Sequence, residues 1–213
     1  MYSSPQETDE QNTLDTEIQT EQPPARKRQI VTTIICVLIV ALLAVTCALL
    51  VKTYVISTFK VDGISMFPTL DGGSGSLSDT DPTNGETLYL NRLAKIKRGD
   101  IVVFTPEWDS MRLADGSYKS LVKRVIAVEG DHLQIIDGKV WLNGELLDEP
   151  YINGVMSHDH DGLDVTVSAG HVFCMGDNRN HSSDCRDHGE VPVSSVVGKC
   201  FLIKSISGKL RKP

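Results

Sequence analysis

Hydrophobic and polar positions along the chain follow two patterns, and the first is a single long apolar run. Residues 30–51 carry no charged side chain and are mostly Ile, Val, Leu and Ala. A helix over this run would rise roughly 33 Å at about 1.5 Å per residue, which is enough to cross the hydrocarbon core of a bilayer. The sequence therefore predicts one transmembrane helix over 29–52.

Beyond residue 53 the pattern changes to short apolar runs broken by Gly, Asn and Asp. Runs rich in Val, Ile, Phe and Leu with alternating polarity are typical of β-strands. Strands are predicted at 56–61, 87–90, 101–104, 121–128, 133–136, 139–142, 165–167, 171–175 and 199–205. Asp137-Gly138 between two of them is a hairpin signal. The predicted fold class is mainly β, with linked antiparallel sheets or a barrel over 53–213.

Three polar stretches between these strands are predicted to be exposed loops, at 71–85, 106–117 and 152–164. The first is nearly all Gly, Ser, Asp and Thr and is expected to be mobile. The third contains His158-Asp159-His160-Asp161, a weak candidate for a metal site. A solvated polar loop is favoured, because metal ligands need a rigid frame and further groups that orient them by hydrogen bonds. No metal is therefore expected.

Charge adds a tail and an orientation to this outline. Residues 1–28 form an acidic segment with too little apolar surface for a core, so it is expected to be disordered. Arg26, Lys27 and Arg28 precede the span, which places the N-terminus in the cytoplasm and the rest outside. A cleaved signal peptide is disfavoured, because the apolar run is too long and no small-x-small site ends it. The net charge of −7 and the lack of a basic face argue against a nucleic-acid partner.

The cysteines indicate neither a disulfide framework nor a zinc knuckle. Cys36 and Cys47 lie in the span, and Cys174, Cys185 and Cys200 lie outside it, with no C-x-x-C motif. Three cysteines cannot all pair within one chain. One disulfide is compatible with the sequence, and its pairing stays open.

Ser65 and Lys123 are the candidate chemical groups. Ser65 follows Val61-Asp62-Gly63 and precedes Pro68, which could expose its hydroxyl at a strand-to-loop corner. Lys123 shares a strand face with Leu121 and Val125, so desolvation is expected to lower its pKa. A neutral lysine could activate the serine as a nucleophile. The structural alternatives are a turn serine and a lysine that protects a sheet edge.

A dense polar run, 176–186, follows the strand predicted at 171–175. Asp184 and Arg186 could form an ion pair in it, and a hydroxyl could orient a neutral lysine. The alternatives are a solvated loop and a calcium loop. Asp177-x-Arg179 breaks the acidic spacing of an EF-hand, so calcium is disfavoured.

Four runs together closely resemble the motif boxes of type I signal peptidases, the bacterial leader peptidases that use a serine and a lysine. They are Gly63-Ile64-Ser65-Met66-Phe67-Pro68-Thr69-Leu70, then 98–104, then Val122-Lys123-Arg124-Val125-Ile126, and then 176–186. They occur in the order of that family, after a membrane anchor. Residues 138–144 and 149–152 look like its smaller β region, expected at about 131–170. The resemblance covers about 30–205.

The resemblance implies a role for each matching residue. Ser65 would be the nucleophile, with its backbone N–H donating to the oxyanion, and Lys123 would be the general base. Ser182 would hydrogen-bond the lysine, and Asp184 and Arg186 would form a supporting ion pair. In enterobacterial members a serine at the position of Gly63 adds a second oxyanion donor. Gram-positive members have glycine there, as this chain does, so the identity of a second donor stays open. Apolar pockets for alanine-sized side chains would be lined by Phe59, Val61, Leu70 and Val122.

The expected function is that of a membrane-anchored serine endopeptidase that removes signal peptides from exported preproteins through an acyl-enzyme, without a cofactor. The implied partners are preproteins, membrane lipid and a secretion translocon, at a single-pass position in the cell membrane. One alternative is a catalytically idle β module that assists envelope or pilus assembly. A penicillin-binding protein or β-lactamase is disfavoured, because Ser120-Leu-Val-Lys123 fits S-x-x-K without S-D-N or K-T-G. A self-cleaving repressor would carry a DNA-binding domain, which the sequence lacks.

Overall fold

The computed structural model describes residues 25–73 and 85–213. The chain divides into two compact units, Met1–Cys47 and Ala48–Pro213, and each is described by itself. Of the tail predicted to be disordered, 1–28, residues 1–24 lie outside the described residues, and residues 25–28 belong to a helix instead. Most of the loop at 71–85 that was predicted to be mobile also lies outside the described residues.

The apolar run forms helix α1, Ala25–Leu50, which continues into a short π-helical turn, Val51–Val55. The helix begins before the predicted residue 29, because Arg26, Lys27 and Arg28 are good helix formers and join its first turn. Thr32 and Thr46 donate their hydroxyls to carbonyls four residues earlier, which satisfies these polar groups within the helix. Among the described residues, only this helix is long and apolar enough to cross a membrane.

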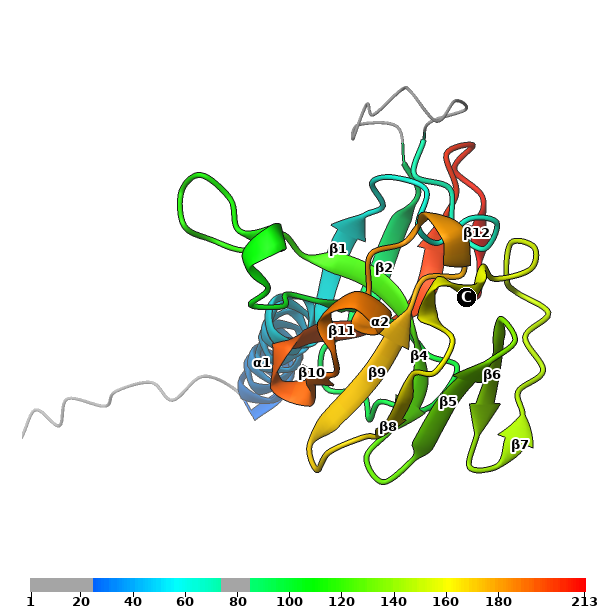
Figure 1. Ribbon diagram of the computed structural model, residues 1–213. Coiled ribbons are helices and arrows are strands. Elements are labelled where there is room, and N and C mark those ends of the chain that lie inside the picture. Colours follow the sequence, from blue (N-terminus) through cyan, green and yellow to red (C-terminus); the bar gives the residue numbers. More distant parts are fainter. Residues whose placement is uncertain (1–24, 74–84) are drawn as a thin grey trace, which may run out of the picture. The chain divides into compact units, whose positions relative to one another are not determined.

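The second unit is built on a curled antiparallel sheet of eight strands (Figure 1). Its strands are β1 Ile56–Lys60, β2 Thr87–Asn91, β3 Ile101–Phe104, β4 Leu121–Val128, β9 His171–Met175, β10 Val191–Pro192, β11 Val196–Lys204 and β12 Leu210–Arg211. The order is β1-β2-β11-β3-β4-β9-β10, and β12 pairs with β11. β1 therefore lies at one edge of the sheet.

A smaller antiparallel sheet of four strands lies next to the C-terminal end of β4 in the chain (Figure 1). It contains β5 His132–Ile136, β6 Lys139–Leu142, β7 Glu145–Leu146 and β8 Asp164–Thr166, in the order β7-β6-β5-β8. Asp137 and Gly138 both have positive φ, 52° and 65°, as a two-residue hairpin turn requires. The predicted hairpin is thus confirmed.

The predicted fold class, mainly β with antiparallel pairing, is confirmed. Each run predicted as a strand contains one, although β8 and β11 begin earlier than expected. The strands that were not predicted, β7, β10 and β12, have two residues each, too few to show an alternation. The short helices are η2 Asp109–Met111, η3 His158–His160, η4 Arg179–His181, α2 Cys185–His188 and η5 Val193–Ser195.

Two hydrophobic clusters fill the β unit, one on each side of the large sheet's central strands. The first gathers around Phe104, Val125 and Phe173. The second gathers around the segment that follows β1, where Met66 and Leu70 are fully buried. Alternate residues of β3 enter different clusters, and β4 contributes Val122 to the second cluster and Val125 to the first, so these two strands belong to both cores.

Candidate active site

Ser65 lies in the tight turn that follows β1. Met66 and Leu70 anchor the turn in the core, and Leu70 N–H donates to Met66 O at 2.9 Å. Gly63 has φ +79°, which favours glycine. Gly72 packs backbone against backbone on Gly63, since a β-carbon at 72 would lie 2.0 Å from Gly63 O. These contacts hold the Ser65 hydroxyl at a rigid corner.

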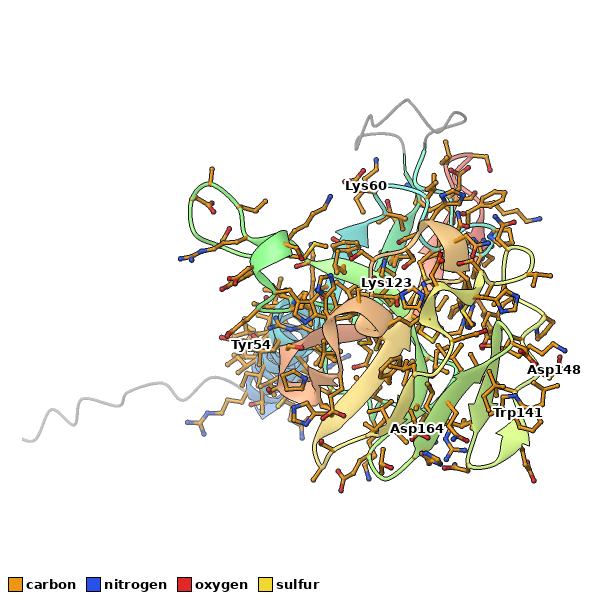
Figure 2. All side chains as sticks on the ribbon, viewed as in Figure 1. Tyr54, Lys60, Lys123, Trp141, Asp148 and Asp164 are labelled. Carbon is orange, nitrogen blue, oxygen red and sulfur yellow. The ribbon has the colours of Figure 1, made fainter. Side chains whose placement is uncertain are left out.

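Lys123 brings its amine to this hydroxyl. It lies on β4, opposite Val102 of β3, and the residue is only 3% exposed. Lys123 Nζ lies 2.7 Å from Ser65 Oγ, within hydrogen-bonding distance. Figure 2 labels Lys123 well inside the β unit, whereas Lys60 and Asp148 lie at its periphery. The expectation of a desolvated lysine close to the serine thus agrees with the geometry.

Burial lowers the pKa of Lys123 from 10.5 to about 8. Removing the ammonium from water disfavours the charged form, and Arg186 acts in the same direction. The negative charge of Asp184 opposes the shift. A substantial fraction of Lys123 is therefore neutral slightly above neutral pH.

The polar run 176–186 supports Lys123 through a buried ion pair. Arg186 Nε donates to Asp184 Oδ1 at 2.9 Å, and both side chains are almost completely buried. Burial alone would raise the pKa of Asp184, but Arg186, Gly176 N–H and the Ser182 hydroxyl hold it below its usual value. Asp184 also caps helix α2 by accepting from Arg186 N–H. The ion pair expected between these residues is present.

Ser182 has a different hydrogen-bond partner from the one that the resemblance implies. Its Oγ donates to Asp184 Oδ2 at 2.7 Å, and in the part of the chain that is described it makes no hydrogen bond to Lys123. The hydroxyl has a single proton, and a carboxylate is the stronger acceptor. The lone pairs of Ser182 Oγ can still accept from an amine.

Gly176 lies where the serine turn and the polar run meet. A β-carbon there would be 2.2 Å from Ser182 Oγ and 2.5 Å from Ser65 O. Only a residue without a side chain fits between these atoms. Gly176 therefore fixes the approach of the two segments.

Sequence reasoning missed a second buried network beside the first. Arg124 donates to both oxygens of Asp177, at 2.8 and 2.7 Å, and Thr69 donates its hydroxyl to the same carboxylate. Asp177 is fully buried, and the Arg124 guanidinium lies 4.0 Å above the ring of Tyr151. The network joins β4, the serine turn and the polar run. The signal available in the sequence was a second charged residue, Arg124, directly after Lys123 in a strand whose other residues are apolar.

Asn178 was also missed, although it holds the serine turn directly. Its backbone N–H donates to Ser65 O, and its side-chain amide donates to Ile64 O, both at 3.0 Å. The next residue, Arg179, forms a buried ion pair with Glu149 of the segment that follows β7. The polar run thus contacts the serine turn on one side and the segment that follows β7 on the other.

A cleft of about 240 Å³ contains Ser65 and Lys123. Of the four residues expected to line it, Phe59 and Val122 do so. Val61 and Leu70 are not on its lining, because both are buried in the hydrophobic cluster that Val122 shares. Gly63 is also on the lining, with no side chain to act as an oxyanion donor. The remaining lining residues include Asp62, Met111, Lys119, Ser120, Leu121, His181 and Ser183.

Open strand edges meet at this cleft. Among the described strands, β1 pairs with β2 alone. Residues 121–123 of β4 pair with β3 on one side, but pairing with β9 begins only at Arg124. In the described part of the chain no further strand pairs along these two edges, so an extended chain can add to the sheet there.

Other candidate groups are not on the lining of the cleft. His158, Asp161 and Asp137 have ligand-type atoms within 4.8 Å of one another, but all three residues are exposed. His158 Nδ1 already bonds Asp161 Oδ2 at 2.7 Å. The cysteines are free thiols, and Cys174 N–H donates to Cys185 Sγ at 3.2 Å. Burial, followed by the Cys185 thiol, raises the pKa of Cys174, so this thiol stays protonated.

Comparison with known proteins gives a consistent result. Signal peptidase I T of Bacillus subtilis is 32% identical over 170 residues, covering 73% of this chain and 77% of that protein. Signal peptidase I of Bacillus licheniformis is 31% identical over 187 residues, covering 80% and 88%. Thylakoidal processing peptidase 1 of Arabidopsis thaliana is 30% identical over 162 residues, and the match spans 45% of its length.

A solved signal peptidase I from Enterococcus faecalis aligns with 50% of this chain and 97% of its own length, at 27% identity and a TM-score of 0.39. Residues 30–204 match the family described as signal peptidase, peptidase S26. That match covers both the apolar helix and the cleft with its serine and lysine. The chain belongs to this signal peptidase family.

Proposed function

We propose that this protein is a membrane-anchored serine endopeptidase that cuts signal peptides from exported preproteins, with Ser65 as nucleophile and Lys123 as general base. Family membership supports signal-peptide removal as the activity. The observation that carries the finer assignment is the 2.7 Å contact between Lys123 Nζ and Ser65 Oγ in a buried setting. A lysine there can be neutral, and a neutral amine can accept the serine proton.

In the first step neutral Lys123 removes the proton from Ser65 Oγ as this oxygen attacks the carbonyl carbon of the scissile bond. The resulting ammonium then protonates the leaving amine. The mature protein departs, and the signal peptide remains as an ester on Ser65. Asp184, whose charge raises the pKa of Lys123, stabilises the transient ammonium.

In the second step Lys123 activates a water molecule that hydrolyses this ester. Both steps pass through a tetrahedral oxyanion. Among the described residues none accepts a hydrogen bond from Ser65 N–H, so this group is available to the oxyanion. Losing one such donor typically costs about 2.7–4 kcal/mol of transition-state stabilisation. Gly63 leaves the second donor to another group or to water.

The substrate would bind as an extended strand along the open edges of β1 and β4. Phe59 and Val122 offer shallow apolar contacts on the cleft, with Val61 and Leu70 behind them. Such shallow contacts favour small side chains before the cut. Preproteins are thus the proposed substrates, membrane lipid surrounds the helix, and a secretion translocon is the source of substrate.

Helix α1 would anchor the enzyme once in the cell membrane, with the N-terminus in the cytoplasm and the β unit outside. The basic residues Arg26, Lys27 and Arg28 before the span support this orientation. Lys123 needs no histidine partner and no cofactor in this scheme.

Cleavage of one preprotein by the full chain in detergent tests the proposal, with the new N-terminus of the product sequenced. We expect Ser65→Ala and Lys123→Ala to lose cleavage, because each removes one of the two reacting groups. Lys123→Arg should lose it as well, because a guanidinium does not deprotonate at accessible pH. Lys139→Ala, at an exposed lysine of β6, is the matched control and should cleave normally. Cleavage by either Ser65→Ala or Lys123→Arg at the wild-type rate would refute the dyad.

A further inference from the structure

A second cavity, larger than the catalytic cleft, opens beside it and takes no part in the proposed reaction. Its volume is about 600 Å³, within the range of natural ligand pockets. It is lined by the first residues of the β3–β4 loop, by Tyr118 near the end of that loop, and by the segment 190–195. We call it the acidic aromatic cavity.

Two contacts show that only a thin partition separates this cavity from the catalytic cleft. Thr105 lines the cavity and Ser120 lines the cleft, and their hydroxyls are 2.8 Å apart. The ring of Trp108, in the cavity, stacks on His188 with centroids 4.4 Å apart. His188 in turn hydrogen-bonds Ser183 Oγ, on the cleft lining, at 2.9 Å. The cavity and the cleft are thus neighbours on the surface of the β unit.

The cavity combines aromatic rings with carboxylates that have no cation beside them. Trp108 and Tyr118 contribute the rings, and Glu107 and Glu190 contribute the carboxylates. Within the described part of the chain neither glutamate forms an ion pair, and no lysine or arginine is on the lining. The nearest lysine in sequence, Lys119, lines the cleft and pairs with Asp62 at 2.9 Å.

This combination suits a cationic side chain. An ammonium or guanidinium is attracted both to a carboxylate and to the face of an indole ring. Trp108 is already held in place by its stack on His188 and by a T-shaped contact with Phe104, whose ring centroid is 6.0 Å away. A pre-organised ring loses little freedom when a ligand binds.

We propose that the acidic aromatic cavity binds a lysine or arginine side chain of the substrate polypeptide, a few residues from the scissile bond. This inference rests on the proposed function, because the occupant is the chain held in the adjacent cleft. An extended chain advances about 3.3 Å per residue, so substrate residues a few positions from the scissile bond can reach beyond the partition. Glu107 and Glu190 thereby set a charge preference outside the apolar pockets.

A lysine scan of cleavable peptides tests this preference. The full chain in detergent is given peptides that differ only in one residue, lysine or norleucine, placed in turn at each of several positions on both sides of the cut. We expect kcat/KM to be about fivefold higher with lysine at one position, the ratio typical of one half-exposed ion pair. The ratio should shrink in high salt. The position of the peak identifies the side of the cut that occupies the cavity.

Variants assign the preference to the cavity. In Glu107→Gln/Glu190→Gln the lysine-to-norleucine ratio should fall to about one, and in Glu107→Lys a glutamate at the same position should become the better residue. Glu145→Gln removes an exposed carboxylate on β7 of the small sheet and is the matched control, which should keep the wild-type ratio.

The outcomes separate this inference from the proposed function. A flat scan from an enzyme that cleaves the norleucine peptides overturns the cavity's role and leaves the endopeptidase assignment intact. A lysine preference that survives unchanged in Glu107→Gln/Glu190→Gln also overturns it. Failure of the wild type to cut any peptide or preprotein refutes the proposed function, and the inference with it.

Discussion

At the scale of single residues, the site depends on one amine kept out of water. Lys123 lies between the core around Val125 and the polar run 176–186, so its ammonium loses hydration that Asp184 only partly replaces. The protein thus stores a cost in the folded state that a surface lysine would not carry. That cost has two measurable consequences, one for the rate and one for stability.

The first consequence is a pH-dependent rate. Only neutral Lys123 can accept the serine proton, and its pKa is about 8. We expect kcat/KM for preprotein cleavage to rise about tenfold per pH unit from pH 5 and to level off above about pH 9. A pH profile of initial rates, with unfolding monitored in parallel, gives the measurement. A rate that stays constant from pH 5 to 10 would contradict a lysine base.

The second consequence is that Lys123→Met should stabilise the protein while it removes activity. The folded pKa is lower than the unfolded value of 10.5, so the cost is complete below pH 8 and disappears as the pH rises past 10.5. It amounts to about 3 kcal/mol at pH 6 and less than about 1 kcal/mol at pH 10. Urea unfolding in detergent, followed by tryptophan fluorescence, compares both proteins at these pH values. An equal gain at both pH values would show that packing, not charge, is responsible.

Gly176 gives a prediction based on space alone. Alanine there would push against Ser182 Oγ and Ser65 O, so Gly176→Ala should displace the serine turn and lower kcat by roughly 100-fold. Gly198→Ala in β11 is the matched control. Its β-carbon would also be crowded, 3.0 Å from Leu90 Cβ, but the atoms nearest to it belong to β2 and not to the serine turn or the polar run. Steady-state kinetics of both variants give the measurement. An equal decrease of kcat in the two variants would indicate a general effect on stability and not a displaced serine turn.

At the scale of elements, three segments converge on the carboxylate of Asp177: β4 through Arg124, the serine turn through Thr69, and the polar run itself. Breaking a buried ion pair by changing one partner typically costs about 3–5 kcal/mol. Asp177→Asn should therefore lower the free energy of unfolding by about 3 kcal/mol and reduce cleavage. Chemical denaturation and kinetics of the variant measure both effects.

Asp62→Asn is the control for that experiment. This substitution breaks the ion pair between Asp62, whose side chain is 32% exposed, and Lys119, whose side chain is 49% exposed. The expected loss of stability is under about 1 kcal/mol, because exposed ion pairs contribute little. Similar losses in both variants would contradict the assignment of Asp177 as the point that joins the three segments.

The elements also show how far a sequence can be interpreted. The strands β1 to β6, β8, β9 and β11 were predicted, because short runs rich in Val, Ile, Leu and Phe between turn residues are a strong local signal. The strand order was not, because β11 inserts between β2 and β3 from the far end of the chain. Nothing in a local pattern specifies such a long-range pairing.

The same distinction holds for the site. The proximity of Ser65 and Lys123 was expected because each occurs in a recognisable run of residues, and their catalytic roles stay a prediction. The Asp177–Arg124 pair and the brace from Asn178 were not predicted, because they join segments more than 50 and 110 positions apart in sequence. The partner of Ser182 was expected to be Lys123 and is Asp184, since the choice between an amine and a carboxylate depends on three-dimensional placement.

At the scale of the whole molecule, an apolar helix and a folded β unit are joined by a very short connection. Only the π-helical turn Val51–Val55 separates α1 from β1. If the helix spans the membrane, the β unit stays at the membrane surface, where the apolar segment of a preprotein also ends. Tethering then raises the effective concentration of enzyme and substrate without any new contact.

Arginine at the centre of the helix tests this arrangement. A charged residue at that depth costs about 2.5–3.5 kcal/mol in insertion, so Ile39→Arg/Leu43→Arg should move the protein out of the carbonate-resistant membrane fraction. Thr53→Arg, just beyond α1, is the matched control and should stay in that fraction. Because the two units are separate, the double variant should still cleave a soluble peptide in detergent while it cleaves membrane-inserted preprotein much more slowly. Equal cleavage of the inserted preprotein by both variants would show that the anchor does not supply the effective concentration.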